Sequence, residues 1–70
     1  MKTFTAVLYA EDDMYIAECP EVGTVSQGDT VEEAVANLRE ATELYLAEFP
    51  LAEQRRPIIT TFEVNECVRA

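Results

Sequence analysis

The chain encodes one amphipathic helix, and this helix limits the folds that the chain can adopt. Thr30 is a typical N-cap, and Glu33, three residues later, completes a capping box. Apolar or small residues then recur at three- and four-residue steps, and Pro50 ends the helix. The predicted packing stripe is Val31, Ala34, Val35, Leu38, Ala41, Thr42, Tyr45 and Phe49. We expect this stripe to pack and the other helix faces to be solvated.

Runs of β-branched and aromatic residues on either side of the helix predict four strands. Residues 3–10 end at an acidic turn, residues 14–19 end at a proline, and residues 24–27 follow the next turn. Residues 58–64 supply the fourth strand. The predicted fold class is α+β with the order β-β-β-α-β, in which the first three strands form a meander. We expect a four-stranded mixed sheet with one helix packed on one face, in a single domain over residues 1–70.

Both faces of this predicted sheet carry apolar side chains. Phe4, Ala6 and Leu8 alternate with Val7 and Tyr9 along the first strand, and the fourth strand alternates in the same way. One helix can cover only one face, and a domain of this size gains little stability from its own core. We therefore expect a homo-oligomer, dimer or tetramer, or a protein partner that covers the second face or extends an open sheet edge.

The net charge of the chain indicates what kind of partner it can bind. Five Lys and Arg residues stand against fourteen Asp and Glu residues, which gives −9. Such a surface repels phosphate backbones, so we expect no direct binding of nucleic acid and expect a basic protein to be the natural opposite. The predicted partner-binding residues are the acidic turn Glu11, Asp12 and Asp13 and the outward helix carboxylates Glu40 and Glu43.

No group of residues is organised for catalysis. The absence of histidine removes the commonest general base, and two cysteines without histidine fall short of a four-ligand zinc site. A two-metal nuclease needs several converging carboxylates, for which Asp12, Asp13, Glu18 and Glu43 are the candidates, but their spacing does not make them meet. We expect a protein that is not an enzyme and has no catalytic residues, metal or cofactor.

The chain shows no export signal. The start of the sequence is too short and too polar for a signal peptide, and no stretch has the apolar length of a membrane span. A cytoplasmic location without membrane contact follows as the expectation, and Cys19 and Cys67 are expected to be free thiols.

Three linked stretches resemble the HicB family. They are Tyr15-Ile16-Ala17-Glu18-Cys19-Pro20-Glu21, then Val25-Ser26-Gln27-Gly28-Asp29-Thr30, then Glu33-Ala34. The resemblance covers residues 3–49 well and the final strand loosely. Its motif residues, for which we expect structural roles, are Pro20, Gly28, Asp29, Thr30, Glu33 and Ala34.

This resemblance implies a degraded, partial RNase H-like fold with sheet order 3-2-1-4 and no surviving nuclease site. HicB proteins are antitoxins that bind HicA, a small basic toxin that cleaves mRNA, and they inhibit it by occlusion. The sequence lacks the C-terminal DNA-binding domain that many members carry, so the expected form is short and stand-alone. The alternatives are a homo-oligomeric binding module without a toxin and a metal-dependent nuclease.

Overall fold

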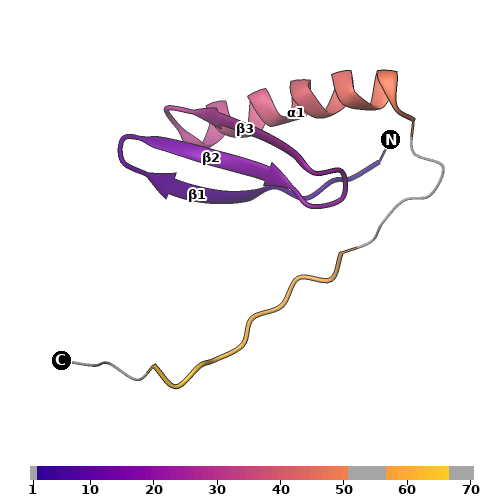
Figure 1. The fold of residues 1–70 in the computed structure, drawn as a ribbon. Coiled ribbons are helices and arrows are strands. Elements are labelled where there is room, and N and C mark those ends of the chain that lie inside the picture. The colour runs from indigo at the N-terminus through magenta and orange to yellow at the C-terminus, as the bar shows by residue number, and fades with distance from the viewer. Residues whose placement is uncertain (1, 51–56, 67–70) are drawn as a thin grey trace.

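The computed structural model of the chain describes residues 2–50 and 57–66. A three-stranded antiparallel sheet in the order β1-β2-β3 carries one helix on one face (Figure 1). The elements are β1 (Val7–Glu11), β2 (Met14–Cys19), β3 (Thr24–Gly28) and α1 (Val31–Glu48). The α+β class, the meander of the first three strands and the single covered face are therefore confirmed.

Strand register places alternate residues of the sheet against the helix. Leu8 of β1 lies opposite Ala17 of β2, and Ala17 lies opposite Ser26 of β3. The buried core consists of Ala17, Cys19, Ala34 and Leu38, with Phe4, Ala6, Leu8, Tyr15 and Val22 packed partly buried against it. The predicted grouping of Phe4, Ala6 and Leu8 on one face is confirmed, although pairing with β2 begins only at Val7.

The start of α1 is capped on both sides of Thr30. The Thr30 Oγ1 accepts a hydrogen bond from the Glu33 main-chain N–H at 3.0 Å, as a capping box requires. The Glu33 carboxylate accepts from the main-chain N–H of Asp29 at 2.6 Å, one residue earlier than the usual partner. The predicted cap is confirmed, with its second bond shifted to the residue before the N-cap.

Gly28 lies where the first turn of α1 meets β3. A Cβ atom built on Gly28 would lie 2.6 Å from the Ala34 main-chain nitrogen and 2.9 Å from the Glu33 carbonyl carbon. Ala34 itself is fully buried against the sheet. Gly28 is therefore required because two main chains approach closely, which is a more specific reason than a flexible link between strand and helix.

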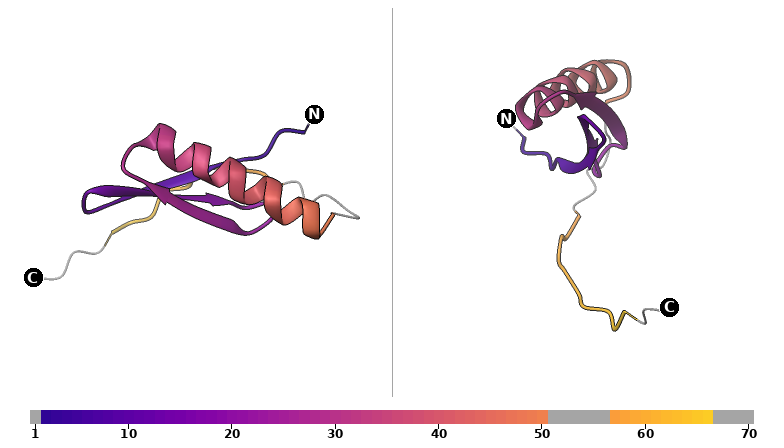
Figure 2. Two further views of the ribbon diagram at one scale, coloured as in Figure 1. Left: turned by 90° about the horizontal axis from the view of Figure 1, so that it is seen from above. Right: turned by 90° about the vertical axis from the view of Figure 1, so that its left-hand side faces the viewer.

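The helix rests on β3 and, less extensively, on β2. Ala34, Leu38 and Thr42 are its buried residues, and the hydroxyls of Thr42 and Thr24 lie 2.7 Å apart in a hydrogen bond to β3. On the same side, the Asn37 side-chain amide donates to the main-chain carbonyl of Gln27 at 2.8 Å. The rest of the predicted stripe is more exposed than expected, because no element of the described residues lies beside the helix over β1 (Figure 2).

The predicted fourth strand is not formed. Residues 57–66 have no strand assignment and run outside the helix and sheet layers (Figures 1 and 2). Ile58 is 91% exposed and Phe62 is 83% exposed. The predicted four-stranded mixed sheet is thus three-stranded over the described residues. An alternating apolar pattern favours the extended conformation, but only a neighbouring edge makes it a strand.

We predict that Gly28→Ala destabilises the fold by about 1–3 kcal/mol, because the added methyl overlaps main-chain atoms of the helix that cannot rotate away. Urea unfolding followed by circular dichroism measures the change in the free energy of unfolding. Gln27→Ala, at an exposed position of the same strand, is the control and should change that free energy by less than about 0.5 kcal/mol. Equal effects of the two substitutions would contradict the close approach at Gly28.

Candidate protein-binding surface

A buried carboxylate fixes the segment that precedes β1. Glu21 is 6% exposed and lies in the turn between β2 and β3. Its two oxygens accept the Thr5 main-chain N–H at 3.0 Å each, and one of them accepts the Thr5 hydroxyl at 2.7 Å. The Cys19 thiol donates to the other oxygen at 3.3 Å. Thr5 and Glu21 are sixteen positions apart in the sequence. The carboxylate thus holds the residues near Thr5 against the end of β2.

These contacts set the protonation of both side chains. Burial alone would raise the pKa of Glu21, but the hydrogen bonds donated by Thr5 and Cys19 outweigh it and hold that pKa below its ordinary value. Burial, and then the bond to the Glu21 carboxylate, raises the pKa of the Cys19 thiol. Cys19 is therefore a neutral, buried donor rather than a reactive thiolate.

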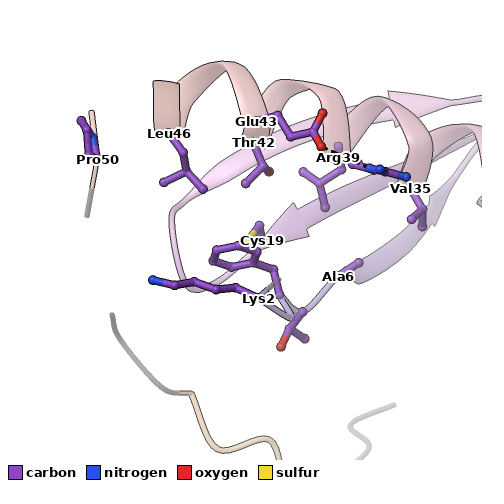
Figure 3. Close-up of a pocket in the computed structure, with 12 residues that line it drawn as sticks. Lys2, Ala6, Cys19, Val35, Arg39, Thr42, Glu43, Leu46 and Pro50 are labelled. Atoms are coloured by element: carbon purple, nitrogen blue, oxygen red, sulfur yellow. Dashed lines mark hydrogen bonds and ion pairs between the residues drawn. The ribbon is translucent and has the colours of Figure 1, made fainter. Parts of the chain in front are cut away.

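A groove opens between α1 and the segment that Glu21 fixes. Its volume is about 780 Å³, which is in the range of binding sites in general. Figure 3 shows Lys2 and Ala6 on one side, Val35, Thr42 and Leu46 on the helix side, and Cys19 between them. The apolar side chains of its lining include Phe4, Ala6, Val35, Leu38 and Leu46. The groove exists because β1 lies beyond the edge of the helix.

The rim of this groove carries cationic side chains. Lys2 and Arg39 both line it, and they are the basic residues among those that the structure describes. Arg39 forms an ion pair with Glu43 at 3.3 Å, in which both side chains are largely exposed. An exposed pair of this kind contributes little to stability and can be exchanged for another partner.

The second face of the sheet is partly apolar, and none of the elements in the described part of the chain covers it. The register places Val7 opposite Glu18 and Glu18 opposite Val25, and it places Tyr9 opposite Ile16. Tyr9 is 53% exposed and Val25 is 57% exposed. The prediction that both faces carry apolar side chains is confirmed for these strands, and this outer face offers a second surface to a partner.

The predicted partner-binding carboxylates fall into two separate groups. Glu11 ends β1, and Asp12 and Asp13 form the turn to β2, where the φ of 55° at Asp12 suits an aspartate. Glu40 and Glu43 lie on α1, exposed like the turn residues. No hydrogen bond or ion pair in the described part of the chain joins the two groups. If both bind a partner, that partner spans the hairpin turn and the helix.

The carboxylates considered for a nuclease do not converge. Glu18 points to the outer face of the sheet, whereas Glu43 lies on the helix that covers the opposite face. Within residues 2–50 and 57–66, no group of three or more acidic or cysteine side chains could hold a metal ion. No helix in that part is long and apolar enough to span a bilayer. Cys67, considered above as a free thiol, lies outside the described residues.

Two features of this surface were not predicted from sequence. The sequence marks Glu21 only as part of the Cys19-Pro20-Glu21 stretch, and the burial of its side chain depends on a contact with the distant Thr5. The signal available was an acid directly after the strand-ending proline, within a linked motif. The groove was missed because the fourth strand was expected to lie beside β1.

Comparison with known proteins finds similarity over part of the chain. The chain is 51% identical over 45 residues to the UPF0150 protein ssr1765 of Synechocystis sp. (strain ATCC 27184 / PCC 6803 / Kazusa). The match covers 61% of this chain and 57% of the relative, so the chain spans little more than half of the relative's length. No protein-family model matches the chain, and no solved structure matches it.

We predict that Glu21→Gln lowers the free energy of unfolding by about 1–3 kcal/mol at neutral pH, because an amide cannot accept all of these hydrogen bonds. The folded pKa of Glu21 is depressed, so its stabilisation is present above the ordinary value of 4.5 and is lost as pH falls through the folded value. The difference in the free energy of unfolding between wild type and variant should therefore become smaller below pH 4.5. Urea unfolding across pH tests this, with exposed Glu40→Gln as the control, and a gap that is independent of pH would contradict it.

Proposed function

We propose that this chain is a protein-binding domain of the HicB antitoxin type, which neutralises a small basic HicA-like ribonuclease by direct contact. It performs no reaction itself. The cytoplasm, where mRNA is translated, is its place of action. The observation that carries the proposal is that the motif residues resembling HicB have structural roles, while the surface around them is acidic.

The motif supports this proposal because it maintains a fold rather than an active site. Thr30, Asp29 and Glu33 cap the helix, and Gly28 and Ala34 allow the helix to lie on β3. Every acidic residue in the described part of the chain is exposed except Glu21. A surface of this kind is suited to electrostatic recognition of a cationic partner.

The mechanism is competition for the same positive charges. A ribonuclease that binds mRNA presents Lys and Arg side chains to phosphates, and an acidic domain lying over them excludes the RNA. Electrostatic attraction between the two proteins accelerates their association. The inhibitor needs no general acid, general base or metal for this task.

The proposal includes a partial RNase H-like fold of order 3-2-1-4. In that fold the place beside β1 belongs to a fourth strand, which residues 58–64 of the same chain or of a second copy can supply. The free edge of β1 and the empty groove next to it are compatible with such an addition.

A stand-alone homo-oligomeric binding module is the second candidate function. The observation that favours it is the row of exposed apolar side chains in residues 58–64, which suits contact with another protein surface independently of any toxin.

We predict that charge reversal at the contact surface slows association with the partner by about tenfold and weakens its salt dependence. The probe is the purified basic protein encoded in an adjacent reading frame, and stopped-flow fluorescence measures the association rate. Glu11→Lys with Asp13→Lys tests the turn, and Glu40→Lys with Glu43→Lys tests the helix. Glu32→Lys with Glu48→Lys, at exposed helix positions outside the predicted contact residues and away from the outer sheet face, changes the net charge equally and is the control.

The outcome separates the two surfaces. If both test pairs behave like the control pair, the predicted contact residues are wrong. If the genome encodes no small basic protein with a prominent histidine beside this gene, or if that protein cleaves mRNA equally fast with and without this chain, the antitoxin function is wrong.

A further inference from the structure

We propose that two copies of this chain exchange their C-terminal segments, so that residues 58–64 of each copy lie along β1 and fill the groove of the other. The interaction surface is the groove between α1 and the residues before β1, together with the free β1 edge. The partner is a second copy of the same chain. This inference goes beyond the proposed function and does not require a toxin.

The donor segment has the pattern of a strand with one apolar face. Ile58, Phe62 and Val64 share one side of an extended chain, and they are 91%, 83% and 72% exposed. The opposite side carries Ile59, Thr61 and Glu63. Three large apolar side chains so exposed in one row are unusual for a surface segment unless another protein surface covers them.

The acceptor surface matches this face in size and chemistry. The groove is open, mainly apolar and about 780 Å³ in volume. Next to it, β1 pairs with β2 on one side and with no strand of the described residues on the other. The β3 edge differs, because Asn37 of the helix already donates to the Gln27 carbonyl there. The β1 edge is therefore the one that remains available for main-chain pairing.

Charge also matches donor to acceptor. The segment carries Glu63, and Glu66 follows it. The charged residues that line the groove are Lys2, Arg39 and Glu43, and because Arg39 and Glu43 form an ion pair, Lys2 gives the lining a net positive charge. In a chain of net charge −9, most contacts between copies bring like charges together. At the groove, a second acidic copy meets the Lys2 ammonium group and an exposed Arg39–Glu43 pair that can exchange partners.

Exchange between copies gives a use to both features of each chain, the donor segment 58–64 and the acceptor groove. A twofold dimer needs a surface that is complementary to itself, and one donor segment with one acceptor groove per chain meets that need. The domain's own fully formed core is small, comprising Ala17, Cys19, Ala34 and Leu38. Three further apolar side chains from the partner would enlarge each core, which is how small domains commonly gain stability.

Phe62→Asp tests the dimer. Analytical ultracentrifugation of the full chain between about 1 and 100 µM should show a wild-type dimer, and the variant should raise its dissociation constant by about 100-fold or more. Thr61→Asp adds the same charge on the opposite side of the segment and should change that constant by less than about threefold. A wild-type monomer throughout this range, or equal effects of the two variants, would overturn the proposal.

A disulfide test separates exchange from folding back onto the same chain. Val35→Cys in the groove is combined with Phe62→Cys in a Cys67→Ser background, oxidised, and examined on a non-reducing gel. Exchange gives a covalent dimer, and mixing the two single variants gives a disulfide between copies. An internally linked monomer, or no link despite an unchanged circular dichroism spectrum, would overturn the exchange. Inhibition of the toxin, measured on the same wild-type protein, tests the proposed function separately, because its result does not depend on whether the chain forms this dimer.

Discussion

The close contact between the first turn of α1 and β3 determines the arrangement of the whole domain. Gly28 allows the main chain of Ala34 to approach the strand, and the cap formed by Thr30 and Glu33 starts the helix at that point. Because the helix is fixed over β3 and β2, β1 extends beyond it. The groove is the uncovered strip between α1 and the residues that precede β1, so the candidate binding surface follows directly from the position of the helix.

Glu21 holds in place the second wall of that groove, which the residues before β1 form. Its carboxylate replaces strand pairing for the residues around Thr5, which precede the paired part of β1. A buried carboxylate is costly unless donors surround it, and here a main-chain N–H, a hydroxyl and a thiol do so. The HicB-like stretch from Tyr15 to Glu21 therefore supports the edge of the sheet in the same way that the stretch from Gly28 to Ala34 supports the helix. Both stretches maintain the shape of the surface around the groove.

Local signals predicted the local elements well. The cap at Thr30, the end of β2 before Pro20 and the alternation of Phe4, Ala6 and Leu8 depend on neighbours in the sequence, and the structure has them where expected. The structure does not show the predicted fourth strand, because a strand exists only with a paired edge and the pattern of residues 58–64 specifies no partner. The role of Glu21 depends on Thr5, and the reason for Gly28 depends on the path of the helix. Neither contact is encoded in spacing along the chain.

Within the described residues, the two features of this small acidic domain that are open to a partner are the apolar groove and the edge of β1 that pairs with no strand. Amide hydrogen exchange on the full chain, followed residue by residue over a series of protein concentrations, tests this claim most directly. If two copies exchange residues 58–64, the amides of these residues and of β1 become protected together as concentration rises, because each strand edge then has a partner. Amides in residues 58–64 that exchange at the rate of an unstructured peptide at every concentration would contradict it.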